Sequence, residues 1–194
     1  MTKEVLASLI SVAVGAALAL LSTIGYDFIK ERHERVKLIK VIYVDVQNNL
    51  TSLYTGLRDL PYDIAQNKDF IYGCDFDLRF FDSYAKEIPL LSPIDAARVM
   101  SFYGELAKAN EVKNILKDTS NNLTSAERKR WINFMYEKMF KSTRNGRRIM
   151  SDFEKKYKIR PLGDVKKAMD VYEEQIVSRN PDLKNKLRIP DGSL

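Results

Sequence analysis

The chain begins with a long apolar stretch. Residues 5–26 carry no charged side chain, and a helix of that length is about 33 Å long, close to the roughly 30 Å hydrocarbon core of a bilayer. The residues that follow include five cations, Lys30, Arg32, Arg35, Lys37 and Lys40. An excess of Lys and Arg marks the cytoplasmic side of a membrane helix. The pattern therefore predicts a single-pass protein of the bacterial inner (cell) membrane, with its N-terminus outside and its C-terminal domain cytoplasmic.

A cleaved signal peptide is the alternative interpretation of this stretch, because Ala17-Leu18-Ala19 has the form of a cleavage site. The residues before the apolar run carry only Lys3 and Glu4, so they lack the positive charge of a signal peptide. The run also continues beyond the cleavage site to Ile24. Both features favour an uncleaved anchor.

Small residues recur at every fourth position of this helix, at Ala7, Ser11, Gly15, Ala19 and Thr23. Such a stripe lets helix backbones approach closely in lipid. The stripe predicts that copies of the chain associate, and a ring of copies would place it around a pore. An Ala-rich helix without a partner is the alternative.

A second pattern covers residues 28–60, where apolar side chains alternate at spacings of three and four. These positions are Val36, Ile39, Tyr43, Val46, Leu50, Leu53, Leu57 and Leu60. This a/d rhythm predicts a long helix buried along one seam, and a second contact between copies. Further apolar residues widen the surface, so we expect the helix to pack in a bundle. It should end at Pro61, since the residue before a proline resists the helical conformation.

Residues 61–187 contain the patterns of several shorter helices. We expect a loop over 61–77, a short helix that stops at Pro89, and a helix that starts at Ser92-Pro93. Thr124 and Glu127 form a capping box for the next helix, which an interruption at Asn145-Gly146 would divide. A last helix begins near Asp164. No strand pattern is present, so the prediction is an all-α chain with an anchor at 1–27, a juxtamembrane helix at 28–60, a helical domain at 61–187 and a flexible tail at 188–194.

The composition removes many kinds of catalytic site. The 194 residues include one cysteine, Cys74, and one histidine, His33, which excludes an internal disulfide and any site that needs two imidazoles. There is no phosphate-binding glycine loop and no nucleophile elbow. Asp75, Asp77 and Asp82 lack the spacing of a calcium loop. We therefore expect no enzyme, no cofactor, no metal and no small-molecule substrate.

Positive charge is concentrated in residues 124–167, which hold fourteen Lys/Arg and five Asp/Glu, against a net charge of +6 for the whole chain. The candidate binding residues are Arg128, Lys129, Arg130, Arg144, Arg147 and Arg148, interleaved with Trp131, Tyr136 and Phe140. Such a patch suits nucleic-acid phosphates, anionic membrane lipid or a protein partner. A solvated surface without a specific partner is the remaining alternative.

Several segments resemble small bacterial membrane-anchored helical proteins, most of which have no assigned function. They are Val44-Asp45-Val46-Gln47-Asn48-Asn49-Leu50, Phe81-Asp82-Ser83-Tyr84, Leu90-Leu91-Ser92-Pro93 and Phe102-Tyr103-Gly104-Glu105-Leu106. The resemblance covers residues 1–117, and its motifs have low specificity.

The layout is also similar to the membrane-pore accessory proteins of type VI-B CRISPR systems. That resemblance implies ring-shaped pores that aid antiphage defence. The family's Arg-x(4–6)-His element is missing, because no histidine follows Arg144, Arg147 or Arg148. The resemblance therefore implies pore formation without ribonuclease activity.

Together these patterns predict a non-enzymatic membrane protein that homo-oligomerises as a pore or membrane-perturbing effector. The alternative is an anchored binding module whose basic surface recruits nucleic acid, anionic lipid or a protein partner.

Overall fold

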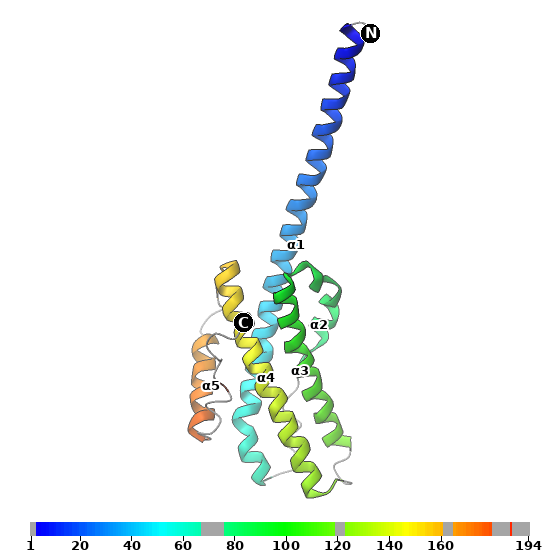
Figure 1. Cartoon of the computed structure of the whole chain (residues 1–194). Coiled ribbons are helices and arrows are strands. Elements are labelled where there is room, and N and C mark those ends of the chain that lie inside the picture. The colour runs from blue at the N-terminus through cyan, green and yellow to red at the C-terminus, as the bar shows by residue number, and fades with distance from the viewer. Residues whose placement is uncertain (1–2, 67–75, 119–122, 161–164, 180–186, 188–194) are drawn as a thin grey trace. The chain divides into compact units, whose positions relative to one another are not determined.

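The described part of the chain is helical. The computed structural model describes residues 3–66, 76–118, 123–160, 165–179 and 187, and side chains from residue 14 to 58 and in the later segments. The helices are α1 (Lys3–Gln66), α2 (Arg79–Tyr84), the 3-10 helix η2 (Ala85–Leu90), α3 (Pro93–Asp118), α4 (Ser125–Tyr157) and α5 (Val165–Arg179) (Figure 1). No strand occurs among the described residues. The predicted all-α class is confirmed.

The chain divides into two units, Met1–Leu38 and Ile39–Leu194. In the first unit, the described residues of α1 from Val14 to Glu34 are all exposed. They include eight large apolar side chains between positions 14 and 29, each 53–68% exposed. The described residues from 14 to 34 therefore form no core of their own.

The structure corrects the prediction of a membrane span. Searching the described residues finds no helix that is both long and apolar enough to cross a bilayer. A span needs about 20 consecutive apolar residues, and Asp27, Lys30 and Glu31 follow the apolar run in α1. The localisation predicted from the sequence, a single-pass inner-membrane protein, is wrong on this finding.

The second unit is a bundle built on the seam of α1. The side chains of Ile39, Tyr43, Val46, Leu50, Leu53 and Leu57 are at most 1% exposed. Against them pack α3, which buries Val99, Phe102 and Leu106, and α4, which buries Met139, Ile149 and Phe153. Pairing of Arg98 with Asp152 and of Glu105 with Lys138 shows that α3 and α4 run antiparallel. The described helices of this unit thus share one apolar core.

Two predicted helix breaks are absent. Helix α1 runs through Pro61 to Gln66, so the loop expected to start at 61 does not start there. A proline costs a helix one backbone hydrogen bond, and burial of the preceding turns at Leu53 and Leu57 offsets that local cost.

The second absent break lies at Asn145-Gly146, where α4 continues without interruption. A Cβ atom at Gly146 would lie 2.8 Å from Phe102 Cε2 and 2.9 Å from Leu50 Cδ2. Both neighbouring side chains are fully buried. The glycine is therefore a point of close approach of α1, α3 and α4, and not a helix end.

The helix starts follow the sequence closely. The backbone N–H of Asp95 donates to Ser92 Oγ at 3.3 Å, one residue before α3 begins. At α4 the N–H of Glu127 donates to Thr124 Oγ1 at 3.3 Å, and the N–H of Thr124 donates to Glu127 Oε2 at 3.0 Å. The capping box predicted at 124–127 is confirmed, and it satisfies backbone donors that have no partner within the helix.

Candidate functional site

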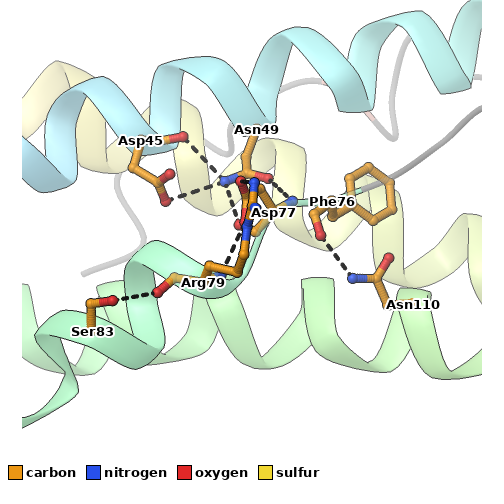
Figure 2. A network of polar contacts seen from close by, with 7 residues as sticks. All are labelled: Asp45, Asn49, Phe76, Asp77, Arg79, Ser83 and Asn110. Atoms are coloured by element: carbon orange, nitrogen blue, oxygen red, sulfur yellow. Dashed lines mark hydrogen bonds and ion pairs between the residues drawn. The ribbon is translucent and has the colours of Figure 1, made fainter.

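A buried polar network joins α1 to the segment that precedes α2 (Figure 2). The Asn49 side chain donates to the Asp77 carbonyl at 3.1 Å, and its Oδ1 accepts from the Asp77 N–H at 3.1 Å. It also donates to the backbone and side chain of Asp45, both at 3.2 Å. Asn110 of α3 donates to the Phe76 carbonyl at 3.0 Å. Two amides therefore fix residues 76 and 77 between two helices.

Asp45 is the buried carboxylate of this network and is only 7% exposed. Its carboxylate accepts a hydrogen bond from the Tyr103 hydroxyl. Burial raises the pKa of Asp45 above its ordinary value, and the hydrogen bonds from Tyr103 and Asn49 only partly oppose the rise. Burial also raises the pKa of Tyr103. The hydrogen bond between Tyr103 and Asp45 therefore holds α1 against α3.

A second buried carboxylate, Asp95, joins the start of α3 to the end of α4. It accepts hydrogen bonds from Lys156 Nζ at 2.5 Å, from Tyr157 Oη at 2.8 Å and from Ser92 Oγ at 2.7 Å. Burial by itself would raise the pKa of Asp95, but these bonds outweigh it and lower the pKa. Through its Oδ2 atom the Asp95 carboxylate thus joins the start of α3 to the end of α4.

An open cleft of about 590 Å³ lies beside the first network. Its lining is mostly polar and includes Asp77, Arg79, Asp82, Asn110 and Lys113. Arg79 is paired with Asp77 at 2.7 Å, and this pairing lowers the pKa of Asp77 to about 2. Of the three aspartates noted in the sequence, Asp77 is paired with Arg79, Asp82 is exposed, and Asp75 lies outside the described residues. Among the described residues no group of three or more His, Cys, Asp or Glu could hold a metal.

The predicted basic residues of α4 separate into two sets. Arg147 pairs with Glu173 of α5, and nearby Lys138 pairs with Glu105 of α3 at 3.2 Å. These cations connect helices. By contrast, Arg128, Lys129, Arg130 and Arg144 form no ion pair with any described residue, and Lys129 and Arg130 are exposed. Arg148 is half-buried on the same helix and has contacts of its own.

The aromatic residues among these cations separate in the same way. Tyr136 stacks on Phe140, which is buried. Trp131 and Phe134 meet edge-to-face at 6.2 Å, and Phe134 remains 39% exposed. The first pair belongs to the bundle, whereas the second lies at its surface.

The two predicted oligomer contacts have different surroundings. The seam from Ile39 to Leu57 is buried within its own unit and has no surface to offer a second copy, although Val36 is exposed. In the small-residue stripe, Gly15, Ala19 and Thr23 are exposed, and the Thr23 hydroxyl donates to the Ala19 carbonyl at 3.0 Å. Ala7 and Ser11 lie outside the described side chains. Of these two predicted contacts, the stripe is the one whose described residues are open to a partner.

The remaining candidates from the sequence are His33 and Cys74. His33 is exposed on α1. Cys74 lies outside the described residues, as do residues 188–194.

Sequence reasoning missed the buried network. Asp45 and Asn49 are polar residues four positions apart inside a strongly apolar run, and that spacing places them on one helix face. Polar residues on the buried side of a helix need hydrogen-bond partners, so this spacing could have indicated a buried polar network. The partners Asp77 and Tyr103 lie 28 to 58 residues away, and no local pattern identifies them.

Comparison of the chain with protein families, curated proteins and solved structures finds no match. The fold and the surfaces described above are therefore the basis for assigning a role.

Proposed function

We propose that this protein is a non-enzymatic, self-assembling protein whose copies associate through the apolar part of α1 near its start. The observation that carries the proposal is the exposure of Val14, Leu18, Leu20, Leu21, Ile24, Tyr26, Phe28 and Ile29. Monomeric proteins rarely leave contiguous apolar surface of more than a few hundred Å² in water. A second copy of the chain brings the same surface and supplies a partner of matching chemistry.

The gain from covering this surface is large enough for assembly. Full burial of one such side chain is worth about 1.5–3 kcal/mol, so covering half of all eight contributes on the order of 10 kcal/mol per copy. Association costs about 4–15 kcal/mol in lost freedom of motion. Contact with more than one neighbour would raise the gain further without a proportional cost.

The side chains on this segment support more than one neighbour. Val14, Leu18, Leu21 and Phe28 fall on one face at spacings of four, three and seven, the a/d rhythm of a coiled-coil seam. Ala19 and Thr23 lie on the opposite face and Gly15 lies at its edge beside Leu18, because each residue advances the helix by about 100°. A bulky face of one copy can pack on the small face of the next. Head-to-tail contacts of this kind close into rings or extend as filaments, so we expect more than two copies.

The test is the mass of the full-length chain by sedimentation. Leu18→Glu with Leu21→Glu places two charges on the bulky face and should convert a discrete assembly into monomers. The matched control is Ile94→Glu with Met100→Glu, because these α3 residues are also apolar and 57–61% exposed. The control protein should keep the mass of the wild type.

Three results would contradict the proposal. One is a wild-type chain that sediments as a monomer, and another is an assembly that survives Leu18→Glu with Leu21→Glu. The third is a chain that stays monomeric in solution and assembles only when lipid vesicles are added, as a flotation assay would show.

A further inference from the structure

The first half of α4 carries a surface in which cations and aromatic rings alternate. We call it the aromatic–basic face and define it by Arg130, Trp131, Phe134 and Lys141. Arg130, Phe134, Lys138 and Lys141 follow one another at spacings of four, four and three, so they share one side of the helix. Trp131 lies beside them, in contact with Phe134. Residues 128–141 contain five Lys/Arg and a single acidic residue, Glu137.

The two rings are held in place before any partner arrives. Lys138 Nζ lies 4.7 Å from the centre of the Phe134 ring and is itself paired with Glu105 at 3.2 Å. Trp131 meets Phe134 with its ring plane turned by 87°. Because Lys138 is almost buried, its charge supports the ring from the bundle side. A ring fixed in this way loses little conformational entropy when another ring stacks on it.

The cations of the face remain available. Arg130 is exposed and forms no ion pair with a described residue. Lys141 pairs at 2.8 Å with Glu137, whose side chain is 57% exposed, and a surface pair of this kind contributes little and is easily exchanged. The start of α4 is not part of the site, because the capping box already occupies the backbone donors of Thr124 and Glu127.

We infer that the aromatic–basic face binds single-stranded nucleic acid. Bases that are not enclosed in a duplex stack on Phe134 and Trp131, while Arg130 and Lys141 pair with the phosphates on either side. Base stacking on aromatic side chains tolerates any sequence, so the face recognises the single strand and not a particular order of bases. In a duplex the base planes are covered by their neighbours, and only the phosphate contacts would remain. This inference does not depend on self-assembly, because the face lies within one copy.

The chain contains a direct reporter of this event, since Trp131 is its only tryptophan. The experiment titrates the full-length protein at low salt with a twenty-nucleotide oligothymidylate and follows Trp131 fluorescence. Stacking should quench the emission as the strand binds. A duplex of the same length should bind more weakly and quench less. The Leu18→Glu/Leu21→Glu protein should bind as well per copy as the wild type at saturation.

Two matched pairs of variants locate the contact. Phe134→Ala should weaken binding about tenfold, the effect of losing one stacked base. Phe80→Ala is its control, because Phe80 of α2 is equally exposed at 39% and should bind as the wild type does. Arg130→Gln should reduce the slope of log affinity against log salt by about 0.7, the value for one phosphate contact on a single strand. Lys155→Gln removes an exposed cation at the far end of α4 and should leave both affinity and slope unchanged.

Each contrary result overturns the inference. Equal affinity for duplex and single strand, with no change in Trp131 emission, would show that only charge is recognised. Unchanged binding by Phe134→Ala would remove the stacking contact. Preference for vesicles containing phosphatidylserine over the oligonucleotide would assign the face to a lipid surface instead.

Discussion

Residues 14–34 and residues 39–57 belong to one helix, α1, and both stretches are rich in apolar side chains, yet their surroundings are opposite. In the first stretch every described residue is exposed, whereas in the second the seam residues are fully buried. The difference lies in what the rest of the chain supplies. Helices α3 and α4 cover the second stretch, whereas the residues of the first stretch remain exposed. An apolar periodicity therefore indicates that a surface will be covered, but it does not say whether the cover comes from the same chain.

The largest expected effect is the difference in unfolding free energy between a substitution in each of the two stretches. Leu53→Ala removes a fully buried side chain and should lower the free energy of unfolding by about 2–5 kcal/mol. Leu21→Ala, at a position 66% exposed, should change the stability of a monomer by about 0.5 kcal/mol or less while weakening assembly. Urea unfolding followed by circular dichroism, below the concentration of assembly, measures both. Equal losses for the two variants would mean that both stretches have the same environment.

The next effect concerns the charge buried in the second unit. Tyr103→Phe removes the hydroxyl that donates to Asp45 and should cost about 1.5–3 kcal/mol at pH 7, the value of a hydrogen bond to a charged group. Because burial raises the pKa of Asp45, the fold favours its protonated form. Lowering the pH through that raised pKa should therefore shrink the difference between variant and wild type. Urea unfolding at a series of pH values provides the measurement, and a difference that grows in acid would contradict the assignment.

Much of this bundle could be predicted from the sequence, because its signals are local. The seam spacing, the Ser92 cap and the capping box at Thr124 each depend on residues within a turn of one another, and the structure has all three. The roles of Lys138 and Arg147 could not be predicted, since each finds its carboxylate 26 to 33 residues away on another helix. The prediction of a membrane span failed for a related reason: an apolar run alone does not say what covers it. A role in antiphage defence stays a prediction.

A smaller effect distinguishes two glycines within helices. Gly146→Ala places a methyl group against Leu50 and Phe102 and should cost about 1–3 kcal/mol through overpacking. At Gly104 of α3 a Cβ would meet nothing within 4 Å, so Gly104→Ala should stabilise the fold by about 0.5–1 kcal/mol through helix propensity. Thermal unfolding of the two variants should shift in opposite directions. Shifts of the same sign would show that the packing at Gly146 relaxes.

The smallest effect tests how far the start of α4 depends on its cap. Thr124→Ala removes the side chain that accepts from the Glu127 N–H and should cost about 1 kcal/mol. Thr124→Ser keeps the hydroxyl and should cost almost nothing. Hydrogen exchange of the first turn of α4 resolves an effect of this size, and equal exchange in both variants would make the cap dispensable.

The close approach at Gly146 also restricts how this gene can vary. Every amino acid that replaces glycine after a change of one base in its codon carries a Cβ atom, and here that atom would lie within 3.0 Å of two buried side chains. No missense change at this codon is sterically silent. Lineages that preserve the bundle should therefore preserve this codon's meaning while neighbouring surface codons drift.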